Sequence, residues 1–305
     1  MGGRCMEYNQ NNGANVKPKS KLPVALILGL GMIVFVAVVF AVVFHSMFDD
    51  SDMKPFGGAK VKEQKIWETD GLIVSATELG YMDGDRKEQP ALFLKINNGT
   101  SQDLVLRCDA LSVNNTAMHT ALAAEAVTGS VVDTALPLDR RSLYDLQIRT
   151  VGEIVAKLSA CEKGSGNVLY SSGPLTIKTS KAKKADEPKY PYSVNTFYEK
   201  DGIKLATTSL FPAYTDASSA VGFYVKNSTD RDILISQKEA AVNGTPYQRA
   251  GSFVFPAGTE GTFYLELDWA ELEAVLPMKE LTGTVEIGYA EDDGKIAEAK
   301  FSFIP

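Results

Sequence analysis

Histidine and cysteine are scarce in this chain, which has two histidines and three cysteines among 305 residues. No Cys/His grouping has the spacing of a zinc site. His119 could activate a thiolate only if Cys108 or Cys161 lay beside it, and no asparagine or aspartate stands in a recognisable context to orient such a pair. We therefore expect no catalytic, cofactor-binding or metal-binding residues, and a protein that is not an enzyme.

Basic residues are also fewer than acidic residues. The chain has 31 lysines and arginines against 38 aspartates and glutamates, for a net charge of −7. Residues 1–21 carry four basic side chains and one acid, so the net charge of the remainder is −10. Such acidity argues against nucleic acid or anionic lipid as the ligand of that remainder. It is compatible with cations, basic partners or simple solubility.

Charge is absent altogether from residues 22–44, a continuous apolar run. A membrane helix needs ~20 such residues, so we expect this run to cross a bilayer as a single helix. Basic residues precede it and acidic residues follow it, which predicts a cytoplasmic N-terminus and an extracellular C-terminal part in a single-pass plasma-membrane protein. The alternative is a cleaved signal peptide, but the apolar run continues beyond the candidate cleavage site at residues 39–41, which favours an uncleaved signal-anchor.

The segments on either side of this run differ in composition. Residues 1–21 are rich in Asn and Gly and have no apolar periodicity, so we expect a disordered cytoplasmic tail. Residues 45–66 are polar and contain Pro55 and two adjacent glycines, which is typical of a stalk.

From residue 67 the sequence repeats itself, in order and with small length changes. Segments 67–74, 98–104, 113–116 and 150–153 match segments 198–205, 227–233, 242–245 and 268–271, respectively. Ordered internal similarity indicates two copies of one domain, which we place at residues 67–180 and 194–305. Residues 181–193 contain a lysine cluster and two prolines, and we interpret them as a solvated linker rather than a contact for an anionic envelope polymer.

Each copy is predicted to be mainly β. Apolar residues alternate over short runs, the period of a half-buried strand, and turn-forming pairs such as Asp-Gly separate the runs. Two sheets packed face to face fit this pattern better than a barrel does. One short helix is expected in each copy, because Thr150 with Glu153 and Asp268 with Glu271 have capping-box spacing. Residues 284–290 and 296–303 are expected to form a hairpin. The side chains expected in the two cores are Leu94, Ile96, Leu104, Leu106, Phe223, Val225, Ile233 and Ile235.

Three groups of polar residues have both a structural and a functional interpretation. Cys108 and Cys161 either form a disulfide or remain two separate buried thiols. The acidic turns at residues 83–85 and 291–293 lack EF-hand spacing, so turn formation is favoured over calcium binding. Four Asn-x-Ser/Thr triplets pair off between the copies, which favours duplicated turns over glycan acceptors; they begin at Asn98, Asn114, Asn227 and Asn243.

The whole pattern resembles a group of uncharacterised Gram-positive bacterial proteins with a short cytoplasmic N-terminus, one membrane helix and tandem immunoglobulin-like repeats outside. The matching segments are YSSGPLTI at 170–177, EKDGIKL at 199–205, YVKNSTD at 224–230 and AVNG at 241–244. The resemblance implies immunoglobulin-like β-sandwiches, but its motifs are those of strands and turns, so it implies no activity. Some of these proteins carry a cytoplasmic zinc ribbon, which the one cysteine in residues 1–21 cannot form.

These observations favour a membrane-anchored, extracellular, non-catalytic binding or structural module of the bacterial cell envelope. Its partner would be an envelope polymer or a protein, and not nucleic acid. One alternative is the ectodomain of a sensor or membrane complex that acts through a separate cytoplasmic partner. A hydrolase of envelope material is a further alternative, which only the weak Cys/His pairing supports.

Overall fold

A computed structural model of the chain describes residues 56–82, 89–190, 195–212, 218–247, 251–268, 278–292 and 294–304. The chain divides into two compact units, Met1–Asp52 and Met53–Pro305, and all described residues belong to the second. Among the described residues, no helix has the length and apolar character to cross a membrane. The predicted tail, the predicted span at residues 22–44 and the start of the predicted stalk lie outside them.

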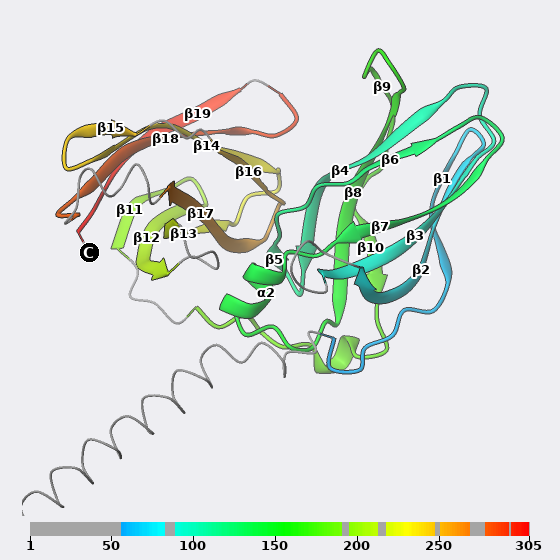
Figure 1. Cartoon of the computed structure of the whole chain (residues 1–305), viewed down its shortest axis with the longest axis horizontal. Helices are drawn as coiled ribbons and strands as arrows, with labels where there is room; N and C mark the ends of the chain where they lie inside the picture. The colour runs from blue at the N-terminus through cyan, green and yellow to red at the C-terminus, as the bar shows by residue number, and fades with distance from the viewer. Residues whose placement is uncertain are drawn as a thin grey trace, which may run out of the picture. The chain divides into compact units, whose positions relative to one another are not determined.

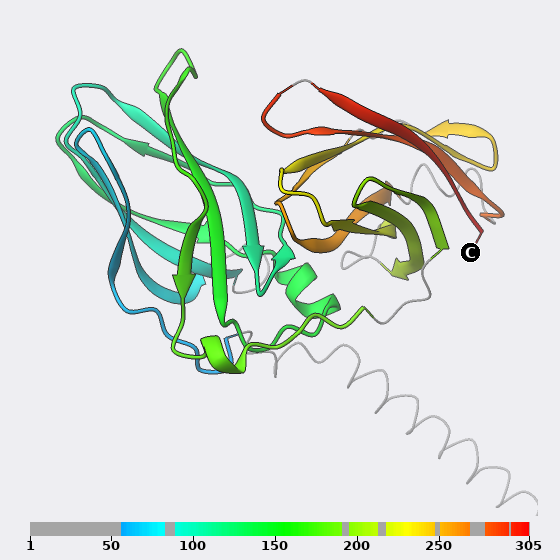
Figure 2. The ribbon, with the colours of Figure 1, turned by 180° about the vertical axis from the view of Figure 1, so that it is seen from behind.

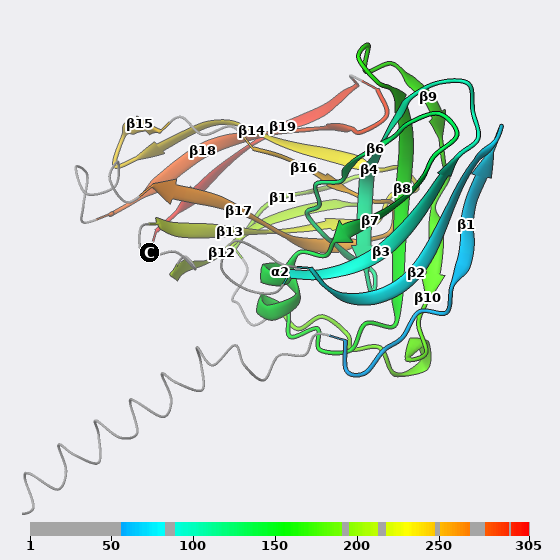
Figure 3. The same ribbon diagram turned by 45° about the vertical axis from the view of Figure 1, so that its right-hand side comes forward.

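The prediction of a mainly β protein is confirmed, with 61% of residues in strands and 4% in helix. In the first repeat, one antiparallel sheet has the order β1-β2-β3-β7 (Figure 3). Its strands are β1 (Gln64–Thr69), β2 (Leu72–Met82), β3 (Gln89–Asn98) and β7 (Val131–Pro137). The facing strands of the first repeat are β4 (Leu104–Val113), β5 (Thr116–Ala117), β6 (Ala123–Ala126), β8 (Glu153–Glu162), β9 (Val168–Ser171) and β10 (Leu175–Lys178). A short helix α2 (Arg140–Asp145) and a 3-10 turn η2 (Ala182–Lys184) accompany them (Figure 1).

The second repeat has the same strand order. Its first set pairs as β11-β12-β13-β17, and its second as β15-β14-β18-β19 with β16 on β14. These strands are β11 (Asn195–Lys200), β12 (Ile203–Pro212), β13 (Ser218–Asn227), β14 (Ile233–Val242), β15 (Thr245–Tyr247), β16 (Ser252–Phe255), β17 (Glu260–Asp268), β18 (Leu281–Tyr289) and β19 (Lys295–Phe303). β18 and β19 form the predicted hairpin (Figure 2).

Register irregularities fall at matching places in the two repeats, as duplication of one domain predicts. The β1–β2 ladder shifts between Lys65 and Trp67, and the β11–β12 ladder shifts between Thr196 and Tyr198. The β4–β8 ladder shifts after Cys108, and the β14–β18 ladder shifts after Gln237, the residue that aligns with Cys108. A bulge inserts a residue at a specific point of a strand, so shared bulges are a mark of common descent of the two sheets.

The predicted core side chains are buried. Leu94, Ile96, Leu104 and Leu106 belong to one apolar cluster, and Phe223, Val225, Ile233 and Ile235 belong to the other. Phe223 lies at the centre of the second cluster, stacked 4.7 Å from the ring of Phe263 and edge-on to Phe301 at 4.8 Å. The alternation of apolar residues therefore predicted correctly which face of each strand meets the core.

The turn asparagines form the same hydrogen bonds in both repeats. Asn98 Nδ2 donates to the carbonyls of Gln102 and Ala126, and Asn227 Nδ2 donates to the equivalent carbonyls of Arg231 and Phe255. Each Oδ1 accepts from the backbone of the threonine two residues on. Asn114 and Asn243, both at positive φ, each accept from two consecutive amides, at the start of β8 and just before β18, respectively. The structural interpretation of these four residues is confirmed.

The helix predicted to begin at Thr150 is wrong. Glu153 starts β8, while the short helix of the first repeat begins earlier, with Asp139 as its N-cap. The amide of Thr150 is bound by the Asp186 carboxylate, and the amide of Glu153 is bound by Asn114. Both amides thus have partners outside a helix, and the following apolar alternation continues as a strand. Asp268 ends β17, and residues 269–277, where the second helix was predicted, lie outside the described residues.

The first repeat extends beyond its predicted limits. Phe56 and Ala59, in the predicted stalk, are buried in its core. Lys60 N donates to Ser180 Oγ at 3.0 Å, and Ser180 N donates to the Lys60 carbonyl at 2.8 Å. The predicted linker also packs on this repeat, because Asp186 binds the backbone near Thr150 and Lys189 N donates to the Leu146 carbonyl. Residues 56–66 and 181–190 are therefore parts of the folded repeat.

Direct contacts join the two repeats. Thr116 in β5 pairs with Glu260 in β17, so a single sheet of ten strands includes strands of both repeats. Ala117 is fully buried in the second core, and a Cβ at Gly261 would lie 3.0 Å from the Ala117 carbonyl oxygen. Lys157 Nζ lies 2.7 Å from Asp232 Oδ2. Burial lowers the pKa of Lys157, but its hydrogen bond and ion pair with Asp232 outweigh burial, so the net pKa lies above its usual value.

Candidate functional site

Cys108 and Cys161 are separate free thiols. Cys108 pairs with Leu158 across the β4–β8 ladder, whereas Cys161 pairs with Val105. A strand rises about 3.3 Å per residue, so the three-residue offset separates the two positions by roughly 10 Å, beyond the reach of a disulfide. Of the two alternatives that the sequence left open, the structure has the separate thiols.

The residues considered for catalysis are not arranged for it. Burial, with the nearby Asp109 charge, raises the pKa of Cys108 to about 12, so its thiol stays protonated at neutral pH. His119 is exposed, and its ring centroid lies 5.8 Å from that of Phe253 in the second repeat. No group of three or more His, Cys, Asp or Glu side chains in the described part of the chain could hold a metal ion.

The acidic turn near the C-terminus follows ordinary turn chemistry where it is described. Asp292 Oδ1 accepts from the Gly294 amide at 2.9 Å, and Oδ2 lies 2.7 Å from Arg231 Nη2. These contacts hold the Asp292 pKa below its usual value. Residues 83–85 and Asp293 lie outside the described residues.

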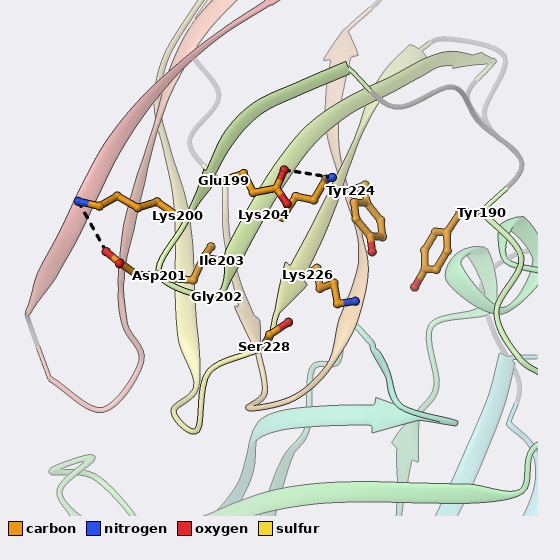
Figure 4. Close-up of a pocket in the computed structure, with 10 residues that line it drawn as sticks. All are labelled: Tyr190, Glu199, Lys200, Asp201, Gly202, Ile203, Lys204, Tyr224, Lys226 and Ser228. Atoms are coloured by element: carbon orange, nitrogen blue, oxygen red, sulfur yellow. Dashed lines mark ion pairs between the residues drawn. The ribbon is translucent and has the colours of Figure 1, made fainter.

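A groove of about 620 Å³ lies on the outer face of β11, β12 and β13 (Figure 4). We call it the lysine groove. It is lined by Tyr190, Glu199, Lys200, Asp201, Gly202, Ile203, Lys204, Tyr224, Lys226 and Ser228. Its long side chains alternate along β12 and β13 with the core residues Leu205 and Val225, which is why they point away from the core. Its volume falls within the ordinary range for ligand sites.

A row of charged residues crosses the lysine groove. Strand register places Glu199 opposite Lys204, Lys204 opposite Lys226, and Lys226 opposite Glu260 in β17. Lys204 Nζ lies 3.3 Å from Glu199 Oε2, and Lys200 pairs with Asp201 at 3.7 Å. Lys226 is exposed and forms no ion pair with any described residue. Two lysines opposite each other on neighbouring strands repel, and only Lys204 forms an ion pair with the carboxylate opposite it.

Two tyrosines form one wall of the groove. The rings of Tyr190 and Tyr224 lie edge-on, with centroids 4.8 Å apart. The Tyr224 hydroxyl donates to Glu260 Oε2 at 2.6 Å, which engages the carboxylate opposite Lys226. Burial, followed by the neighbouring Glu260 charge, raises the pKa of Tyr190, and burial with the Glu260 hydrogen bond raises that of Tyr224. Both phenols therefore stay protonated, so they are neutral hydrogen-bonding groups at physiological pH.

Another hollow, of about 900 Å³, lies over β14 and β18. Small and apolar residues such as Ala240, Ala241, Pro246 and Gly283 form much of its lining. Lys238 at its edge pairs with Glu286 at 3.0 Å. The lysine groove differs because it combines an exposed, unpaired ammonium with hydroxyl groups and aromatic rings, the chemistry that fixes a polar ligand.

Sequence reasoning missed the lysine groove. Alternation along each strand could have placed Lys204, Tyr224 and Lys226 on the outer face. Their mutual positions depend on strand register, however, and Tyr190 comes from a segment that was interpreted as a linker.

Comparison with known proteins identifies no family. No family model matches this chain. No curated protein matches it either. One matching solved structure, described as the structural basis of neurohormone perception by the receptor tyrosine kinase Torso, is 9% identical over 95% of this chain and 94% of that one. Its TM-score is 0.21, which is too low to support an argument about fold or function.

Proposed function

We propose that this protein is a membrane-anchored, extracellular, non-catalytic binding or structural module of the Gram-positive cell envelope. Residues 22–44 would be its uncleaved anchor, with the N-terminus in the cytoplasm. The two repeats would be immunoglobulin-like β-sandwiches. The uncharged apolar run, the charge asymmetry of its flanks and the resemblance of both repeats to such envelope proteins support this proposal.

The lysine groove is the observation that carries the binding role. It is open to solvent, lies on a sheet face and presents an unpaired ammonium beside two tyrosine rings and a serine hydroxyl. The ten-stranded sheet, which includes strands of both repeats, supports these side chains. A rigid, open, polar surface suits recognition of a partner better than it suits enclosure of a reaction.

A retention assay tests the proposal. The full chain, purified in detergent and immobilised, is incubated with native cell-wall fragments and, separately, with a detergent extract of membranes. We expect saturable retention of one of them, with heat-denatured protein as the control. Retention of neither, together with turnover of a wall substrate that His119→Ala abolishes, would favour the hydrolase alternative instead.

A further inference from the structure

The charged row of the lysine groove is not required by the fold. Strand register equates Glu199, Lys204, Lys226 and Glu260 with four residues of the first repeat. Those residues are Glu68, Ile73, Asn97 and Val131. The first repeat thus forms the same sheet without a lysine at either central position. The two adjacent lysines therefore need an explanation other than architecture.

We infer that the lysine groove binds an anionic, hydroxyl-rich polymer, with Lys226 holding a phosphate or carboxylate group of one repeating unit. This inference rests on the proposed function and names the ligand class of that binding module. Lys226 supplies the positive charge, while the exposed Ser228 hydroxyl and the ring of Tyr190 line the same groove and can contact hydroxyl and C–H groups of the same segment (Figure 4). An anion between Lys204 and Lys226 would also relieve the repulsion of two like charges on neighbouring strands.

The surroundings of Lys226 favour an anion over a neutral ligand. Glu199 is engaged by Lys204, and Glu260 is engaged by the Tyr224 hydroxyl. Both carboxylates thus have other hydrogen-bond or ion-pair partners, while Lys226 forms no ion pair with any described residue, so its exposed ammonium is available to an external anion. The net charge of the whole chain is −7, so attraction of an anion has to be local to this groove rather than general.

The position of the groove favours a hydroxyl-rich polymer over an acidic peptide as the ligand. The groove lies on the face of a sheet, where backbone amides are already used in the ladders β11–β12 and β12–β13. An extended peptide is usually recognised through such amides at a free sheet edge. Here the available groups are the Ser228 hydroxyl, the tyrosine rings and one ammonium, which match a hydroxyl group, sugar or polyol C–H groups and one negative charge.

The test compares defined polymers and two matched variants. The full chain in detergent is titrated with poly(glycerol phosphate), hyaluronan, neutral dextran and poly-glutamate. Lys226→Asn introduces asparagine, which the first repeat has at the equivalent position, Asn97. We therefore expect this variant to fold. Lys178→Asn makes the same change of charge at an exposed position in β10 and serves as the control. Lys204→Ile, which copies Ile73, provides a second groove variant if Lys226→Asn does not fold.

We expect poly(glycerol phosphate) or hyaluronan to bind, and the one that binds distinguishes a phosphate from a carboxylate source. Lys226→Asn should weaken that binding by about tenfold, the loss of one charge-assisted contact, and Lys178→Asn should not weaken it. Added salt should weaken it as well. Equal binding of dextran, preference for poly-glutamate, or an unchanged affinity in Lys226→Asn would overturn the inference. If wall fragments bind but Lys226→Asn has no effect on their retention, the groove assignment fails while the proposed function stands.

Discussion

Asn98 and Asn227 show how single side chains define the turns of this fold. Each is almost fully buried, and each uses both its amide nitrogen and its oxygen to bind backbone from two separate segments. The amide thereby joins a carbonyl of its own turn to a carbonyl at the end of a neighbouring strand. The Asn-x-Thr pattern predicted a turn at each position. It did not predict the distant partners, the carbonyls of Ala126 and Phe255, which lie about 28 residues further along the chain.

Replacement of Asn227 should therefore be costly. Asn227→Ala removes the hydrogen bonds that Nδ2 donates to the carbonyls of Arg231, Phe255 and Pro256, and leaves the Phe255 carbonyl without this donor in a buried site. We expect a loss of about 2–4 kcal/mol in the free energy of unfolding, measured by chemical denaturation. Asp230→Ala, an exposed change in the same turn, should stay within about 0.5 kcal/mol. A similar midpoint for both variants would contradict the structural role of Asn227.

Phe223 offers a test of the second core. Its side chain is 1% exposed and contacts the rings of Phe263 and Phe301. Phe223→Ala leaves a cavity that neighbouring strands cannot fill, so we expect a loss of about 3–5 kcal/mol in the free energy of unfolding. Val168→Ala, at a site 59% exposed, is the control and should have little effect. An unchanged denaturation midpoint for Phe223→Ala would reject this packing.

At the scale of elements, the strands were more predictable than the helix. Alternating apolar residues placed both cores correctly, because a strand has a simple period and one buried face. The capping-box spacing at Thr150 gave a false helix, because Asp186 and Asn114 bind the same amides from distant positions. The true N-cap, Asp139, accepts from Arg141 N, and its spacing was overlooked. The lysine groove escaped prediction for a related reason, since pairing between strands is a long-range property.

The contacts between the repeats should weaken at alkaline pH. Burial raises the pKa of Tyr264, and the Asp145 charge adds to the shift, while Lys157 has a pKa above its usual 10.5. Groups with a raised folded-state pKa stabilise the fold fully below the unfolded pKa, and this stabilisation is lost as pH rises through the folded value. We expect a steady melting temperature between about pH 7 and 9 and a fall above about pH 10.

Two tyrosine variants separate this effect from general alkaline unfolding. Tyr264→Phe removes a titrating phenol from the contact with Asp145, so its melting temperature should fall less steeply above about pH 10 than that of the wild type. Tyr170→Phe, in the first repeat, should keep the wild-type slope. Identical slopes for all three proteins would show that ionisation of Tyr264 does not contribute to the alkaline fall in melting temperature.

For the whole molecule, the internal repeat was the most informative feature of the sequence. It predicted two similar β domains, and the strand order and the register irregularities recur between the two repeats. It could not predict that residues 56–66 and 181–190 belong to the first repeat, because polar, proline-containing segments are also typical of free linkers. Nor could it predict the pairing of β5 with β17, which depends on contacts between the copies.

The proposed topology has a direct test. If the N-terminus is cytoplasmic and residues 67–305 are extracellular, protease added to intact protoplasts should remove the extracellular part and leave a short membrane-protected fragment. Protoplasts permeabilised with detergent are the control, in which the tail should be cleaved as well. Protection of residues 67–305 in intact protoplasts would show that the orientation is reversed.

The contact between Lys60 and Ser180 has a mechanical consequence. Lys60 precedes β1 and Ser180 follows β10, and two hydrogen bonds join them. Tension that travels along the chain past this repeat would first load the contacts outside this pair, the buried Phe56 on one side and the Asp186 hydrogen bonds on the other, and then these two bonds. The strands between Lys60 and Ser180 would stay unloaded until the pair breaks, so we expect its rupture to lengthen the chain and its re-formation to shorten it once the load is removed.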